Sequence, residues 1–207
     1  MKSKIVITAL FLVIMAILPL AAVMCSDIKS DSGQTSEIKS ESDNNYNFDE
    51  IVCGLTAARY REGYCDETIK AISILMNTDY TADKNSFDIS DPEICLFQEE
   101  ADNSVKEKYT DIEQIVNSAK ELTLWQNGEI KYVPYSETSN GNTIGSDSYD
   151  YLCAVASPWD CFDKNFDEQA ECVGVSIGGI DYLCQNGMSA EEALKWYLPN
   201  FEVQKGK

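Results

Sequence analysis

The stretch that decides the fold is GVSIGGIDYLCQNGMSAEEALKWYLPNF, residues 174–201. Its glycine-rich start leads into an apolar helix, which ends at the turn residue Gly187. A second helix begins after Ser189, because Ser-Ala-Glu-Glu places Glu192 at the third helical position and so forms a capping box. That helix ends at Leu198, since the residue before a proline is disfavoured in helical conformation. The stretch therefore predicts a loop, a helix, a turn, a short amphipathic helix and an extended tail.

Length and composition allow one sizeable globular domain plus an end segment. The chain has 207 residues, 44% of them hydrophobic, which is enough for a packed core. It carries 16 basic and 35 acidic residues, a formal net charge of −19, which argues against nucleic acid as a partner. There is no histidine, which excludes Ser-His-Asp and Cys-His catalysis and every histidine-containing zinc site. No cofactor is predicted.

Residues 5–24 form an uninterrupted apolar run behind two lysines. A helix of this length matches the hydrocarbon core of a bilayer, so residues 1–25 are predicted to be a membrane anchor or a cleaved signal peptide. Cys25 leaves a lipoprotein open as a third interpretation. Each of these places the remainder outside the cytoplasm, as a single-pass membrane protein or a secreted one. Residues 26–46 are polar and are predicted to be a flexible linker.

Seven of the eight cysteines follow Cys25, and an oxidising compartment makes disulfides the first expectation. An odd number leaves at least one thiol without a partner in the same molecule. Short spacings favour three local bridges, Cys53/Cys65, Cys153/Cys161 and Cys172/Cys184, although sequence leaves the connectivity open. No Cys-x-x-Cys pair occurs, so no metal site is predicted.

The globular part is predicted to be one α+β domain over residues 47–203, followed by a tail at 204–207. Asn127-Gly128 lies between two apolar runs and is the strongest short-range signal for a β-hairpin. A capping box at Thr110 predicts the start of a helix. The predicted elements are helices at 48–60, at 66–76 and from Thr110, strands at 94–97, 122–126 and 129–135, and a surface loop at 136–148.

Several pieces of the chain, in a fixed order, are similar to segments of one bacterial protein family. They are residues 50–58 (EIVCGLTAA), 67–76, 88–95, 124–130, 135–143, 151–160 (ending in SPWD) and 174–201. Together they resemble the stage II sporulation protein D / amidase-enhancer family over residues 46–203. The resemblance implies the fold of a lytic transglycosylase that acts on peptidoglycan strands stripped of their stem peptides.

The residues that carry that family's chemistry are replaced in this chain. In the family a glutamate after Ala-Ala acts as general acid and then base, as cleavage of a glycosidic bond requires. Here Arg59 follows Ala57-Ala58, and a guanidinium cannot exchange that proton. The other departures are Ser136 and Glu171 at the loop histidines, Ile177 at the loop glutamine, and Ser90 and Ile94 at two presumed metal-ligand positions.

The resemblance implies that the sugar-binding groove of the family is retained, although its catalytic residues are replaced. The predicted substrate-binding residues are Arg59, Tyr135, Ser139, Gly174 and Ser176. Glu62 and Glu171 are the candidates for a relocated catalytic carboxylate, and the solvated-surface interpretation of both is favoured. Trp159 is interpreted as a core aromatic rather than a sugar platform.

We therefore predict a catalytically degenerate protein of the cell wall, linked to sporulation or wall remodelling. It binds peptidoglycan glycan strands or forms complexes with other membrane-anchored wall-remodelling proteins. The alternative is an active lytic transglycosylase with a relocated carboxylate. A third interpretation is a disulfide-stapled surface protein that shares only the scaffold, since fold does not imply activity.

Overall fold

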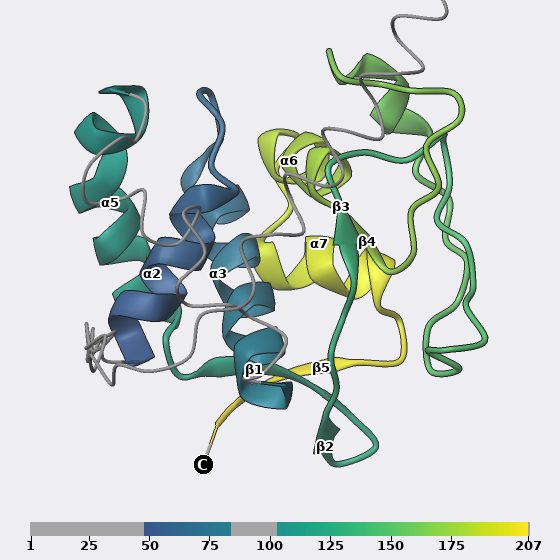
Figure 1. The fold of residues 1–207 in the computed structure, drawn as a ribbon, viewed down its shortest axis with the longest axis horizontal. Helices are drawn as coiled ribbons and strands as arrows, with labels where there is room; N and C mark the ends of the chain where they lie inside the picture. Colours follow the sequence, from purple (N-terminus) through teal and green to yellow (C-terminus); the bar gives the residue numbers. More distant parts are fainter. Residues whose placement is uncertain (1–47, 84–102, 207) are drawn as a thin grey trace, which may run out of the picture. The chain divides into compact units, whose positions relative to one another are not determined.

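The computed structural model describes residues 48–83 and 103–206, which belong to one compact unit, Asn45–Lys207 (Figure 1). The described residues form five α-helices and two small sheets, in agreement with the predicted mixture of helix and strand. The predicted anchor, the linker and the strand at 94–97 lie outside them. Over the described ranges, no helix is both long and apolar enough to cross a membrane.

Helix α3 (Asp66–Ala82) is the centre of the fold. The elements packed against it are α2 (Phe48–Ala58), α5 (Asn103–Ala119), α6 (Ile177–Gln185), α7 (Ala190–Tyr197) and strand β1 (Leu122–Gln126). Figure 1 shows α2 and α5 on one side of α3, with α6 and α7 on the other. Because neighbours surround α3, its side chains are buried around the whole circumference rather than along a single stripe.

The C-terminal part of α3 differs from the sequence prediction. The helix continues to Ala82, past the predicted end at residue 76, and the polar residues Asn77, Thr78 and Asp79 are buried in it. All three bind backbone groups of residues 120–133, in or next to the hairpin of β1 and β2 (Glu129–Ile130). Their partners are the carbonyls of Lys120 (2.9 Å) and Leu122 (2.8 Å), and the amides of Leu124 (2.9 Å) and Val133 (2.7 Å). These hydrogen bonds satisfy side chains that would otherwise favour a turn.

The hairpin at Asn127-Gly128 is confirmed. Both residues have positive φ, 53° and 82°, as the tight hairpin turn requires. Strand β1 pairs with β2 (Glu129–Ile130) on one edge and with β5 (Glu202–Lys205) on the other, both antiparallel. Residues 204 and 205, which were predicted to be a tail, are therefore part of this sheet.

The second sheet joins two segments that are far apart in the sequence. Strand β3 (Tyr135–Ser136) pairs in parallel with β4 (Val175–Ser176), and Tyr135 lies opposite Val175. The strand predicted at 129–135 is consequently split, because β2 ends at Ile130 and β3 has a different partner. This pairing brings the predicted hairpin end against the glycine-rich loop.

Helix α7 begins and ends as predicted. Ser189 and Glu192 form both hydrogen bonds of the capping box, and Leu198 is the C-terminal cap. By contrast, the predicted helix start at Thr110 is wrong, because that residue lies inside α5, which begins at Asn103. The segment before Thr110 contains Lys and Glu, which are good helix formers and extend the helix upstream.

The described cysteines are free thiols: Cys53, Cys65, Cys153, Cys161, Cys172 and Cys184. None of the three predicted local bridges is present in the part of the chain that the structure describes. Their members face different neighbours. The Cys53 thiol, for example, hydrogen-bonds to Tyr109 of α5, whereas Cys65 lies 3.2 Å from the hydroxyl of Thr68.

Candidate functional site

Arg59 occupies the turn directly after α2, at the position where the resemblance implies a catalytic glutamate. Its Nε donates a hydrogen bond of 2.8 Å to the hydroxyl of Tyr135, the first residue of β3. Its Cζ also lies 5.5 Å from the centre of the Tyr135 ring, within cation–π range. Two of the predicted substrate-binding residues are thus brought together, as a contact between a cation and an aromatic ring.

A second arginine, Arg61, is surrounded by carboxylates. It pairs with Glu137, which follows β3, and with Asp163 at 3.4 Å. Asp181 of α6 lies close enough to interact electrostatically with Arg61 and Asp163. We call Arg61, Glu137, Asp163 and Asp181 the Arg61 cluster. It contains one cation and three carboxyl groups, so it offers more hydrogen-bond acceptors than its arginine can use.

The carboxyl of Asp181, in the Arg61 cluster, has a raised pKa. Partial burial is the main cause that raises the pKa of its carboxyl, and the negative charge of Asp163 adds to the shift. Hydrogen bonds from Thr68 and Gln185, both of 2.8 Å, oppose the shift. A carboxyl with a raised pKa next to a second carboxylate is an arrangement that acid–base chemistry can use.

Four aromatic side chains form a continuous row beside the Arg61 cluster. Phe162 stacks on Tyr182 at 5.8 Å between ring centres, Tyr182 stacks on Trp159 at 5.9 Å, and Trp159 meets Trp196 edge-on at 5.2 Å. Phe162 is 74% exposed, Trp196 41% and Tyr182 37%. We call these four residues the aromatic row. Exposed aromatic surface on this scale is typical of a ligand or partner site.

Hydrogen bonds from the fold hold both tryptophans of the aromatic row in place. Trp159 Nε1 donates to the hydroxyl of the buried Tyr197 at 3.0 Å, and Trp196 Nε1 donates to the carbonyl of Ala156 at 2.9 Å. The Tyr197 hydroxyl is itself bonded to Ser157 at 2.5 Å. The rings are therefore oriented before any ligand arrives, which lowers the entropic cost of binding.

The aromatic row and the Arg61 cluster adjoin because they share two elements. Phe162 ends the 3₁₀ helix η2 (Pro158–Phe162), and Asp163 is the next residue. Asp181 and Tyr182 are consecutive in α6, which packs against η2. A side chain at Gly178 would lie 2.5 Å from Asp163 Oδ2, so the start of α6 packs directly on that carboxylate. The two features form one surface with an apolar half and a polar half.

Three of the predicted substrate-binding residues have internal roles instead. Ser139 is fully buried, and Asp160 accepts hydrogen bonds from its hydroxyl at 2.5 Å and its amide at 2.8 Å. Ser176 is also fully buried and caps α6, with a hydrogen bond from Gly179 N. Gly174 has φ +81°, and a side chain there would collide with the Pro134 carbonyl. These residues shape the loops behind the surface.

Glu62 and Glu171, the predicted candidates for a relocated acid, are both exposed. Glu62 lies in the turn between α2 and α3, and Glu171 lies in the segment before β4. Neither has the partial burial that raises the pKa of Asp181.

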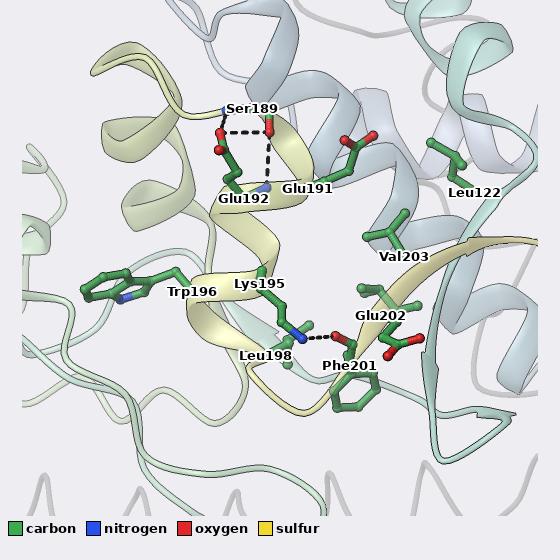
Figure 2. Close-up of a pocket in the computed structure, with 11 residues that line it drawn as sticks. Leu122, Ser189, Glu191, Glu192, Lys195, Trp196, Leu198, Phe201, Glu202 and Val203 are labelled. Carbon is green, nitrogen blue, oxygen red and sulfur yellow. Dashed lines mark hydrogen bonds between the residues drawn. The ribbon is translucent and has the colours of Figure 1, made fainter.

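A large open groove lies between α7 and the sheet formed by β1 and β5 (Figure 2). Its volume is about 1150 Å³, and its walls combine Leu122 and Val203 with glutamates. Lys195 donates a hydrogen bond of 2.7 Å to the Phe201 carbonyl across it. Trp196, the end of the aromatic row, is one of the lining residues, and Figure 2 shows its ring projecting from α7 away from Leu122 and Val203. Arg59 and Tyr135 are not among its lining residues.

The sequence did not predict most of the surface formed by the aromatic row and the Arg61 cluster. Phe162, Tyr182 and Trp196 were not singled out. Trp159, which was interpreted as a core aromatic, is half-buried against the core and also belongs to the aromatic row. The available signal was the placement of Trp159, Phe162 and Tyr182 beside acidic residues, which is weak on its own.

Within residues 48–83 and 103–206, no group of three or more Cys, Asp or Glu side chains is arranged to hold a metal ion.

Comparison with known proteins adds no relative to this picture: no protein-family model matches the chain, and no curated protein matches it.

Proposed function

We propose that this chain is a non-catalytic protein that binds the glycan strands of peptidoglycan. The observation that carries the proposal is the aromatic row, with Phe162 74% exposed and stacked on Tyr182. Sugar rings present flat C–H faces that pack on aromatic rings, and burial of both surfaces removes apolar area from water. A row of four rings offers successive platforms to a linear polymer.

The Arg61 cluster supports the same ligand. Carboxylate oxygens of Glu137 and Asp163 accept hydrogen bonds, and sugar hydroxyls are donors. The overall charge of −19 makes nucleic acid, the other polymer that stacks on aromatic rows, an unfavourable ligand. An uncharged face of a glycan strand therefore fits both halves of the surface.

Arg59 is the reason for proposing that the protein does not cleave glycan. A guanidinium stands at the position where the resemblance to the stage II sporulation protein D / amidase-enhancer family implies the general acid, and it is bonded to Tyr135. In the cell, residues 1–25 would place the domain outside the cytoplasm, next to the wall and to other membrane-anchored wall-remodelling proteins.

Replacing Tyr182 with alanine is expected to weaken glycan binding roughly tenfold, because Tyr182 stacks on both Phe162 and Trp159 and its loss interrupts the row. The assay is sedimentation of the purified full chain with peptide-free glycan strands over a range of strand concentrations. Phe162→Ala should act in the same direction. Phe48→Ala is the matched control, because Phe48 is also partly exposed, at 36%, but contacts Tyr80 outside the row.

Binding by the unaltered chain that Tyr182→Ala and Phe162→Ala both leave intact would place the glycan somewhere other than the aromatic row. Failure of the unaltered chain to sediment would reject the proposed function altogether.

An active lytic transglycosylase is the second candidate, and Asp181 is the observation that favours it. Its pKa is raised and Asp163 lies near, a combination that suits a proton donor. Incubation with peptide-free strands, followed by mass spectrometry for anhydro-muramyl ends, separates the two functions. We expect no such ends from the unaltered chain. Products that Asp181→Asn abolishes would replace the binding function with an enzymatic one.

A further inference from the structure

Two cysteines that are distant in the sequence meet at one threonine. Cys65 directly precedes α3, and its Sγ lies 3.2 Å from the hydroxyl of Thr68. The same hydroxyl donates to Asp181 of α6, and Cys184 lies one turn further along that helix, where both Thr68 and Cys65 influence the pKa of its thiol. Both cysteines are therefore near Thr68, at the interface where α3 packs on α6.

The hydroxyl of Thr68 explains how both thiols are accommodated. Thr68 is fully buried and donates its only proton to Asp181 Oδ1 at 2.8 Å. Its two lone pairs remain available as acceptors for the thiols. The other buried thiols have different neighbours: Cys53 contacts Tyr109, and Cys172 contacts Ser136.

We propose that Cys65 and Cys184 form a disulfide when the protein meets an oxidising disulfide, either that of a thiol oxidoreductase or a small-molecule disulfide. The bond would join the start of α3 to α6, and it is not one of the three pairs that short spacing suggests. The inference does not depend on glycan binding, because it requires only the two thiols and the oxidant.

The chemistry proceeds by two thiol–disulfide exchanges. Cys65 is the accessible thiol, whereas Cys184 is only 6% exposed, so the Cys65 thiolate attacks the external disulfide and releases one thiol. Cys184 then loses its proton to solvent, attacks the Cys65 sulfur and releases the second external thiol. The protein is oxidised by two electrons, and the external disulfide is reduced to two thiols.

Electrostatics gives these two steps their order. Burial is the main cause that raises the pKa of the Cys184 thiol to about 12, and the negative charge of a Cys65 thiolate is the second cause. Once Cys65 is held in a mixed disulfide it carries no charge, so this second cause disappears. The first exchange thereby makes Cys184 easier to ionise for the second exchange.

The closed bond would matter for the candidate site, because Tyr182 and Asp181 lie within one turn of Cys184 on α6. A link to α3 would hold this helix, and with it one ring of the aromatic row, in place.

The test uses the full chain, reduced and then exposed to glutathione disulfide. Remaining thiols are alkylated, the protein is digested without reductant, and linked peptides are identified by mass spectrometry. We expect a peptide pair that joins residues 65 and 184, present in Cys53→Ser and Cys172→Ser but absent from Cys65→Ser and Cys184→Ser. We also expect the reductant to lower the melting temperature by roughly 5–15 °C, because the bond closes a long loop.

Recovery of Cys65 and Cys184 as alkylated thiols after oxidation would overturn the proposal, and so would a link from either residue to a different cysteine. A melting shift on reduction that persists in Cys65→Ser would also contradict it. Cys65 is only partly buried and packs against the core rather than inside it, so this variant is expected to fold.

Discussion

Replacing Gly179 with alanine is expected to lower the free energy of unfolding by roughly 1–3 kcal/mol. A Cβ at this position would overlap the hydroxyl of Tyr197 and lie 2.7 Å from Asp160 Oδ1 and 2.8 Å from Ser157 Oγ. These atoms cannot move away easily, because Tyr197 is 1% exposed and bonded to Ser157. Helix propensity alone predicts the opposite sign, since alanine favours a helix over glycine by about 1 kcal/mol. We expect packing to outweigh propensity here.

Urea unfolding followed by circular dichroism measures this effect. The matched control is Gly145→Ala, because no atom lies within 4 Å of a Cβ at Gly145. Its free energy of unfolding should change by no more than about 0.5 kcal/mol. Adding Tyr197→Phe to Gly179→Ala removes the overlapping oxygen, so the double variant should lose less than the sum of the two single losses. A fully additive double variant, or a Gly179→Ala protein as stable as the original, would contradict this account of the packing.

Asp79→Asn is expected to change how stability depends on pH. Asp79 is fully buried in α3, where Oδ1 accepts a hydrogen bond from Val133 N at 2.7 Å and Oδ2 has no hydrogen-bond partner. Burial is the main cause that raises the pKa of its carboxyl well above the ordinary value, although the Val133 amide and the charge of Arg59 oppose it. The folded protein therefore keeps a proton that the unfolded chain has already released.

The sign of the effect follows from this difference in proton binding. The contribution of Asp79 is fully present below its unfolded pKa, near 4, and is lost as the pH rises through the higher folded pKa. Over that window the original protein should lose up to about 1.4 kcal/mol per pH unit relative to Asp79→Asn, which has no proton to release. The slope of the free energy of unfolding against pH is the quantity to compare, because the buried amide of Asp79→Asn changes stability by the same amount at every pH.

Urea unfolding of both proteins from roughly pH 4 to pH 7 would measure the difference in slope. Asp147→Asn, at an exposed loop position, is the control and should run parallel to the original protein. Parallel curves for Asp79→Asn and the original protein would mean that Asp79 is ionised in the folded state.

Short-range signals in the sequence predicted several elements correctly. The capping box at Ser189, the helix end at Leu198 and the Asn127-Gly128 hairpin all formed as expected. In each case the groups that hydrogen-bond lie within a few residues of one another. The Thr110 capping box failed because the same local pattern is also compatible with the interior of a helix, and the residues before it continue α5.

Long-range contacts account for what the sequence did not predict. The sequence of Asn77, Thr78 and Asp79 predicted a turn, but backbone groups more than forty residues away bind all three side chains inside α3. Ser139 and Ser176 looked available to a ligand, but a buried aspartate and a helix N-terminus use their hydroxyls. The aromatic row escaped notice because η2, α6 and α7 must pack together before its rings touch.

Residue identity and local spacing were enough to establish the absence of histidine, the arginine at position 59, the excess of acidic residues and the caps and turn of the regular elements. Packing of the core around α3 was needed to join β3 to β4, to add β5 beside β1, to align the aromatic row and to bring Cys65 next to Cys184. Caps and tight turns are satisfied by neighbours in the chain, whereas these contacts form between groups whose meeting depends on the burial of the whole apolar core.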